Sequence, residues 1–149
     1  MRAVVQRVSE ASVEVDGAIV GEIGRGLMVL VGCAKGDGDE DVRFIADKIS
    51  NLRVFEDDDG KMNRAVSEID GEVLLVPNFT LCGDCRKGRR PSFTGACAPE
   101  KAKVLMNDLA AYIAGTGLTV AQGSFGAMME ISLTNSGPVT LLLDSDRSF

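Results

Sequence analysis

The 149-residue sequence contains no histidine and no tryptophan. The absence of histidine removes the usual general base of nucleophilic catalysis and the commonest protein ligand of zinc. No apolar run approaches the roughly 18 residues that a membrane span requires, and residues 1–5 lack the basic region of a signal peptide. We therefore predict a soluble, cytoplasmic protein without a membrane partner, whose chemistry does not use histidine.

Positive charge is also in short supply. With 22 acidic and 16 basic residues, the formal net charge at pH 7 is -6. The molecule as a whole would repel a polyanion, so any contact with nucleic acid must come from a local basic patch. The sequence has one such patch on a predicted loop, formed by Arg86, Lys87, Arg89 and Arg90. This concentration of charge favours phosphate binding, and a solvated surface loop is the alternative.

The four cysteines include one C-x-x-C pair, Cys82 and Cys85. Because no histidine can complete a zinc site, a closed one would need Cys33 and Cys97 to converge on the same point. A thioredoxin-type pair would sit at a helix N-terminus, whereas residues 86–91 are typical of a loop. We therefore predict free thiols, no metal and no cofactor, with a zinc or redox protein as the alternative.

Length and a hydrophobic content of 45% predict one domain over residues 1–149. Short apolar stretches between turn residues predict strands at 2–8, 11–15, 18–23, 27–31, 52–55, 72–76, 118–122, 127–133 and 139–143. Strands 27–31 and 139–143 have the pattern of buried strands. The dipeptide Asp16-Gly17 predicts a hairpin turn, and residues 135–138 predict the turn of a closing hairpin.

Apolar residues at helical spacing predict two helices. Residues 37–39 offer capping oxygens for the first, and Pro99 begins the second. Between the helices, three carboxylates at residues 57–59 are typical of a solvated turn, with a metal site as the alternative. Runs of strands interrupted by two helices predict an α+β fold with a curved, mostly antiparallel sheet or barrel-like core.

Two loops contain residues that a hydrophobic core does not explain. One is the strand end at residues 77–80, which precedes the basic loop, and the other is the segment 137–140. Taken alone, a Gly-Pro pair is usually just a turn, and Thr80 is most often explained by its preference for strands. The sequence offers no Ser-His pair, metal-ligand cluster or paired carboxylates at strand ends, which disfavours a hydrolase of free amino acids or peptides.

Five separated motifs, in order and spread from end to end, resemble the D-aminoacyl-tRNA deacylase family: residues 1–8 (MRAVVQRV), 79–81 (FTL), 86–94 (RKGRRPSFT), 125–127 (FGA) and 135–140 (NSGPVT). The resemblance implies an enzyme that hydrolyses the ester of D-aminoacyl-tRNA, and also of glycyl-tRNA(Ala). It further implies a homodimer with active sites at the subunit interface, and no cofactor.

The resemblance also implies roles for individual residues. The catalytic floor of the pocket would be Asn78, Phe79 and Thr80, whose main-chain groups would bind the ester carbonyl. The remaining substrate-binding residues would be Gly137, Pro138, Val139, Thr140, Arg7 and Met129. Among these, Gly137-Pro138 is expected to be a cis peptide that enters the partner's pocket and excludes L side chains. Arg7 would hold that loop, and the basic loop would contact tRNA.

Without histidine, a positioned water assisted by main-chain donors and the ribose 2′-hydroxyl would attack the activated ester. No obvious base is present to activate Thr80 as a nucleophile, so a positioning role is favoured. The sequence departs from the family at Pro77-Asn78, where Ser-Gln is usual. Asparagine keeps the amide one methylene shorter, and proline removes a backbone donor. Two alternatives therefore stay open: a non-catalytic tRNA-binding or editing-accessory module, and a deacylase with a shifted amino-acid preference.

Overall fold

The computed structural model describes residues 1–148. Its strands are β1 (Arg2–Val15), β2 (Ala18–Ile23), β3 (Gly26–Gly32), β4 (Phe55–Glu56), β5 (Met62–Arg64), β6 (Glu72–Pro77), β7 (Thr119–Gln122) and β8 (Glu130–Asp144). The two α-helices are α1 (Asp39–Asn51) and α2 (Pro99–Gly115), and the short 3-10 helices are η1 (Val66–Ile69) and η2 (Phe79–Cys82).

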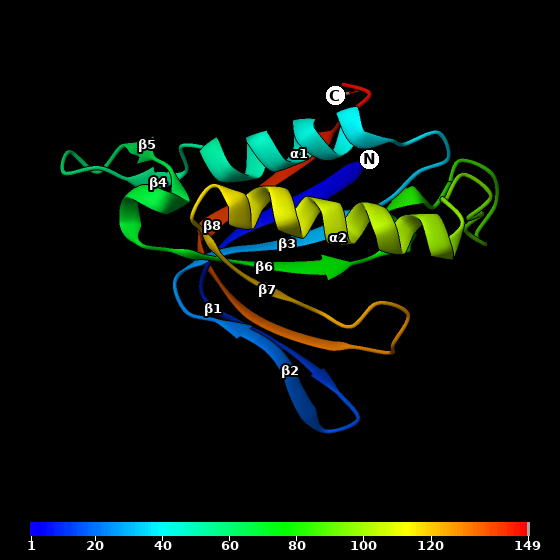
Figure 1. Ribbon diagram of the computed structural model, residues 1–149, viewed down its shortest axis with the longest axis horizontal. Helices are drawn as coiled ribbons and strands as arrows, with labels where there is room; N and C mark the ends of the chain where they lie inside the picture. The colour runs from blue at the N-terminus through cyan, green and yellow to red at the C-terminus, as the bar shows by residue number, and fades with distance from the viewer. Residues whose placement is uncertain (149) are drawn as a thin grey trace.

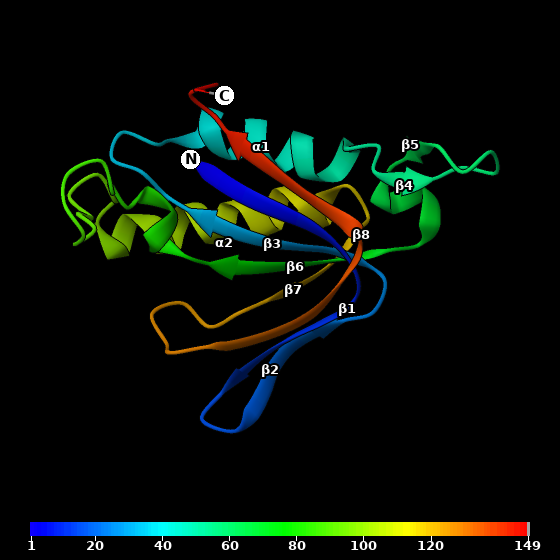
Figure 2. The ribbon, with the colours of Figure 1, turned by 180° about the vertical axis from the view of Figure 1, so that it is seen from behind.

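Six of the strands form one sheet in the order β2-β1-β3-β6-β7, with β8 paired to β1. Strand β1 is antiparallel to β2, β3 and β8, whereas β3, β6 and β7 run parallel to one another. Both helices cover one face of the sheet, and β2 and the neighbouring parts of β1, β7 and β8 curve away from them (Figures 1 and 2). The predicted α+β class with two helices and a curved sheet is confirmed. The sequence did not predict the parallel half of the sheet, in which strand-helix-strand crossovers join β3, β6 and β7.

The prediction of two separate N-terminal strands is wrong, because residues 2–15 form the single strand β1. Residues 2–8 of β1 pair with β3, and Ala11–Val15 pair with β2, so the change of partner interrupts the hydrophobic pattern without ending the strand. The predicted hairpin turn that follows is confirmed: Asp16 and Gly17 both have positive φ, 50° and 81°.

The predicted closing hairpin is also wrong. Residues 130–144 form one strand, β8, which pairs with β1 along both of its halves. Register passes from Gln6 opposite Thr140 to Val8 opposite Asn135, so four residues of β8 lie opposite one residue of β1. The segment 136–139 is therefore a bulge in a continuous strand. The strand predicted at 139–143 is not buried: residues 139, 141 and 143 are half-buried and residues 140 and 142 are exposed, because β8 lies at the edge of the sheet. Strand β8 begins at Glu130 rather than at residue 127.

The hydrophobic core forms on both faces of the sheet. Strand β3 is central, as predicted, and both faces of it are almost wholly buried. One cluster lies between the sheet and the helices and includes Val29, Leu75 and Leu109, whereas a second fills the inside of the curve and includes Met28 and Leu74. Alternate residues of β3 and β6 point into the two clusters, so both faces of each strand are apolar. This explains the continuous apolar runs in the sequences of these strands.

The cap of α1 differs from the prediction. The Asp37 carboxylate is buried and accepts hydrogen bonds from the Met1 amino group at 2.7 Å and from the Ala34 N–H at 2.6 Å. The Gly38 N–H instead donates to the Asp41 carboxylate at 2.8 Å. Asp37 therefore ties the N-terminus to the loop before α1.

Two further segments were predicted from the sequence. The strand expected at 52–55 begins only at Phe55. Residues 57–59 form a turn between β4 and β5, in which the Asp57 carboxylate accepts the N–H groups of Asp59 and Lys61. Neither α-helix of the described chain has the length and apolar surface that a bilayer crossing needs.

Candidate active site

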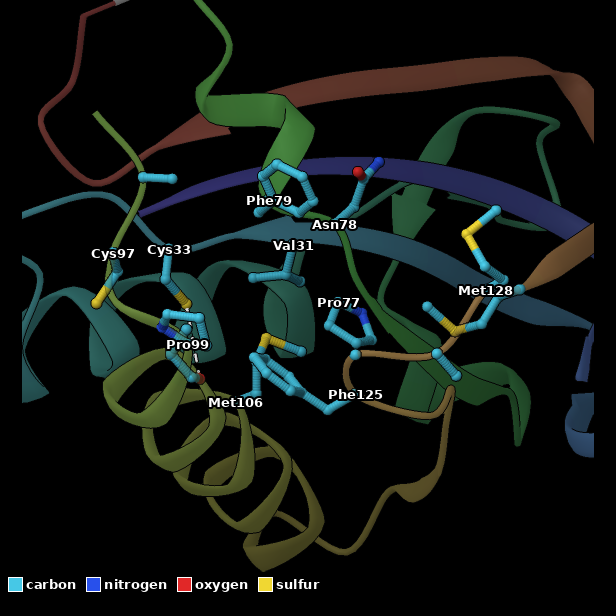
Figure 3. Close-up of a pocket in the computed structure, with 15 residues that line it drawn as sticks. Val31, Cys33, Pro77, Asn78, Phe79, Cys97, Pro99, Met106, Phe125 and Met128 are labelled. Atoms are coloured by element: carbon cyan, nitrogen blue, oxygen red, sulfur yellow. Dashed lines mark hydrogen bonds between the residues drawn. The ribbon is translucent and has the colours of Figure 1, made fainter. Parts of the chain in front are cut away.

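A cavity of about 490 Å³ opens at the carboxyl ends of β3 and β6 (Figure 3). Because β3, β6 and β7 are parallel, the segments that follow them emerge at the same edge of the sheet. The first turns of α2 form the remaining wall. The lining residues are Val31, Cys33, Pro77, Asn78, Phe79, Ala96, Cys97, Pro99, Ala102, Met106, Phe125, Gly126, Ala127, Met128 and Met129.

This lining is mostly apolar, with few polar side chains. A cavity of this size and character suits an organic ligand that buries a flat or apolar part and forms a few hydrogen bonds through its polar part. Three of the residues predicted from the sequence, Asn78, Phe79 and Met129, lie together in it. Thr80 is exposed and does not line the cavity.

The turn η2 orients the residues at the end of β6. The Asn78 N–H donates to the Val31 carbonyl at 2.7 Å, which ties the start of the turn to β3. The Thr80 hydroxyl donates to the side-chain oxygen of Asn78, so its proton is already engaged. Among residues 1–148, the N–H groups of Phe79 and Thr80 have no acceptor, because they begin the helical turn. These two donors are free to bind a ligand oxygen.

Pro77 disturbs no hydrogen bond of the sheet. Since the Asn78 N–H points toward β3, the nitrogen of Pro77 points toward β7. Strand β7 ends at Gln122, which pairs with Leu75, so within residues 1–148 no strand on that side of Pro77 needs an N–H from it. A proline at this edge position is therefore compatible with the sheet.

The Gly137-Pro138 peptide bond is cis, as the resemblance implied, and lies in the exposed bulge of β8. Arg7, the one residue opposite the bulge, donates from Nε to the Ser136 carbonyl and from Nη1 to the Val54 carbonyl, both at 2.7 Å. The family resemblance implied this holding role for Arg7. A planar guanidinium suits it because its donors reach two carbonyls in fixed directions.

Asn135 also holds the bulge, although sequence reasoning gave it no role. Its side-chain oxygen accepts the Val139 N–H at 2.9 Å, and its Nδ2 donates to the Val139 carbonyl at 3.0 Å. The same Nδ2 lies 3.0 Å from Oε1 of Gln6. Asn135 thus closes the base of the bulge, a task that suits a side chain with both a donor and an acceptor.

Within one chain, the bulge and the cavity do not form a common site. Arg7 and residues 137–140 are absent from the cavity lining. Arg7 instead lines a separate small hollow together with Phe55 and Ser136. The structure therefore brings together only part of the predicted site.

The basic loop is closed by two backbone hydrogen bonds between Asp84 and Ser92, at 2.8 and 3.0 Å. Arg86 is paired with Asp84 at 2.7 Å, and hydrogen bonds from Arg86 hold the pKa of the Asp84 carboxyl well below its usual range. The other three cations, Lys87, Arg89 and Arg90, are exposed and form no ion pair within residues 1–148. The loop lies near the N-terminal end of α2 (Figure 1).

The cysteines differ strongly in exposure. Burial raises the pKa of the Cys33 thiol to about 12, with a further contribution from the nearby Asp37 carboxylate. Cys82 is buried and donates to the Cys33 carbonyl at 3.4 Å, whereas Cys85 is exposed. In the part of the chain that the structure describes, no three Cys, Asp or Glu side chains are grouped in a way that could hold a metal ion.

Comparison with solved structures defines the fold. The fold matches a structure described as a probable eukaryotic D-amino acid tRNA deacylase, with a TM-score of 0.79 over 95% of this chain and 97% of that one, at 17% identity. It also matches a c-Myc DNA unwinding element binding protein, with a TM-score of 0.91 and 40% identity over 97% and 98% of the two chains. The architecture is that of the deacylase fold.

Sequence comparison identifies the family. A family model described as D-Tyr-tRNA(Tyr) deacylase matches residues 4–144. Full-length similarity extends to D-aminoacyl-tRNA deacylases of Halothermothrix orenii and Thermotoga petrophila, each 56% identical over 149 residues and covering 100% of both chains. A deacylase of Desulfitobacterium hafniense is 54% identical over the same length. The chain belongs to the D-aminoacyl-tRNA deacylase family of hydrolases.

Proposed function

We propose that this protein hydrolyses the ester of D-aminoacyl-tRNA, and of glycyl-tRNA(Ala), and so removes wrongly attached amino acids in the cytoplasm. The observation that carries the proposal is the apolar cavity lined by Asn78 and Phe79, beside a turn in which the N–H groups of Phe79 and Thr80 have no acceptor among residues 1–148. Such a cavity would bury the aminoacyl-adenosine end of tRNA, and the two donors would bind the oxygen on which negative charge develops.

The remaining chemistry would use little protein machinery. The ester is already activated, so a water assisted by the ribose 2′-hydroxyl would be the nucleophile. Thr80 would act in positioning, because its hydroxyl proton is donated to Asn78. In this scheme Asn78 fixes the turn through its side-chain oxygen and presents its amide donors to the ligand.

We further propose that residues 1–149 act as one domain within a homodimer. Strand β8 is a 15-residue edge strand on which Ile131 and Leu142 are exposed, and a long apolar edge of this kind favours pairing with another chain. The Gly137-Pro138 bulge projects from the same strand. We propose that a second copy docks along β8 so that the bulge of each chain enters the cavity of the other, where Val139, Thr140 and the rigid backbone would exclude an L side chain.

The basic loop would contact the phosphates of the tRNA. Three of its cations have no ion-pair partner in the described chain, and the loop lies at the same end of the molecule as the N-terminus of α2, which walls the cavity (Figure 1). A local patch of this kind is what a chain of net charge -6 needs to bind a polyanion.

The decisive experiment compares hydrolysis of D-tyrosyl-tRNA, glycyl-tRNA(Ala) and L-tyrosyl-tRNA. Rapid loss of the first two with sparing of the third is expected. If all three esters are cleaved equally, exclusion by the bulge is wrong. If none is cleaved although tRNA binds, the non-catalytic binding module, suggested by Pro77-Asn78, replaces the proposal. A shift of the preferred amino acid that Asn78→Gln reverses would favour the deacylase of altered preference.

A mixed-dimer experiment tests the cross-subunit arrangement. Phe79→Ala damages the cavity and Gly137→Val damages the bulge, so each homodimer should be inactive. If cavity and bulge meet across the interface, a dimer of one chain of each kind contains one intact site and should recover about half of the wild-type activity. If they act within one chain, the mixed dimer stays inactive. Light scattering of each preparation would establish that dimers form.

A further inference from the structure

A second hollow, of about 280 Å³, adjoins the candidate active site. Pro77, Met106 and Phe125 line both hollows and therefore form the partition between them. Figure 3 shows these three residues on the side of the cavity next to α2 and the segment after β7. Two ligand parts joined by a short covalent link could thus occupy the two hollows at the same time.

The second hollow is polar, in contrast to the cavity beside it. Lys103 and Asn107 lie on the same face of α2 as Met106, because residues three and four apart on a helix are neighbours. Gln122, at the end of β7, and Ser124, just after it, form the opposite wall. These four side chains come from two elements that are distant in sequence.

The polar side chains of this hollow are free to bind a ligand. Within residues 1–148, the side chains of Lys103, Asn107, Gln122 and Ser124 form no hydrogen bond or ion pair. No carboxylate is among the lining residues, so the hollow does not repel an anion, although the chain as a whole is acidic.

This combination matches one nucleotide unit of single-stranded RNA. A lysine ammonium attracts a phosphate, whereas amides and a hydroxyl form hydrogen bonds with ribose hydroxyls and base edges. The apolar partition offers a surface against which a base can pack, and Phe125 supplies an aromatic face.

We propose that the second hollow binds the penultimate nucleotide of the RNA 3′ end, with Lys103 at the phosphate that joins it to the terminal nucleoside. This inference rests on the proposed function, in which the terminal aminoacyl-nucleoside fills the larger cavity. The partition of Pro77, Met106 and Phe125 would then separate the two adjacent nucleotides. Specificity for tRNA over a free aminoacyl-nucleoside would come in part from this second hollow.

The test compares two substrates that differ only in what precedes the terminal nucleoside: D-tyrosyl-tRNA and 3′-O-(D-tyrosyl)adenosine. Lys103→Ala should lower kcat/KM for the tRNA ester roughly five- to tenfold, mainly through KM, and leave hydrolysis of the nucleoside ester unchanged. Loss of one phosphate contact should also make the logarithmic salt dependence shallower by about 0.7. Lys103→Arg should retain most of the activity. Lys101→Ala is the matched control, since Lys101 is exposed on the same helix but does not line the hollow.

Equal losses on both substrates, or equal effects of Lys101→Ala and Lys103→Ala, would overturn the inference. If the wild-type protein cleaves neither ester, the proposed function fails, and binding still tests the hollow. In that case the dinucleotide cytidylyl-adenosine should bind more tightly than adenosine to the wild type, and Lys103→Ala should abolish the difference. No difference between the two ligands in the wild type would count against the hollow itself.

Discussion

Removal of the Arg7 guanidinium should displace the Gly137-Pro138 bulge. Arg7 is the residue of β1 that the bulge leaves unpaired, and its side chain fills that position by donating to the carbonyls of Ser136 and Val54. No other residue of the described chain forms a side-chain hydrogen bond to Ser136. In Arg7→Ala the bulge would therefore keep only the side-chain hydrogen bonds at its base, which Asn135 forms with Val139.

The size of the effect follows from the type of bond. A hydrogen bond from a charged donor contributes about 1.5–3 kcal/mol, and the bond to Ser136 is exposed to water, which places it near the lower value. Since about 1.4 kcal/mol corresponds to a factor of ten, the ratio of the bulge in place to the bulge displaced should fall about tenfold. We therefore expect kcat/KM for D-tyrosyl-tRNA to fall by up to the same factor, and the ratio of D- to L-ester hydrolysis to become smaller.

Single-turnover deacylation of the D- and L-tyrosyl esters would measure both quantities, with circular dichroism to establish that the variant is folded. Arg53→Ala is the matched control, because Arg53 Nε also donates to a backbone carbonyl, that of Asn63 at 2.9 Å, in the β4-β5 region. Arg7→Lys should be intermediate, since an ammonium keeps the charge but not the two fixed donor directions. A folded Arg7→Ala protein with wild-type rate and selectivity would refute the reasoning, as would an equal loss in Arg53→Ala.

Three further predictions follow from the same structure. Gly137→Ala should lower D-ester hydrolysis, because φ is +149° and an added Cβ would lie 2.8 Å from the backbone nitrogen of the residue two positions on; an unchanged rate would contradict this. At pH 8 an alkylating reagent should label Cys85 first and Cys33 last, as peptide mass spectrometry would show, since the pKa of Cys33 is raised to about 12. Arg89→Gln should weaken tRNA binding more than Arg86→Gln, whose cation is already paired, and filter binding would detect the reverse order.

The sequence predicts best the elements whose signal is local. Both helices and strands β2, β3 and β6 follow from hydrophobic spacing and turn dipeptides within each segment. The continuity of β1 and β8 does not follow, because it depends on which strands pair with each half. Likewise, the segment 135–138 has the composition of a turn, and only its pairing with β1 makes it a bulge.

The same distinction applies to the candidate site. Asn78, Phe79 and Met129 were predicted through the family resemblance, and the structure places them in one cavity. Asn135 lies within the motif at 135–140 but was assigned no role there, and Lys103 lies in no motif; an asparagine in a turn and a lysine on a helix are otherwise ordinary surface residues. Their roles depend on what lies opposite them in the folded chain, which no local pattern contains.

The departure at Pro77-Asn78 is explained more fully by the structure than by the sequence. The missing N–H of Pro77 interrupts no strand pairing, because β7 ends before it, and the Asn78 amide still anchors Thr80. The framework of the site is therefore intact. Yet Pro77 forms part of the wall shared by the two hollows, and Asn78 lies in the larger one. We therefore expect this departure to change which aminoacyl ester the protein accepts and how it binds the RNA end, and to leave stability and folding unchanged.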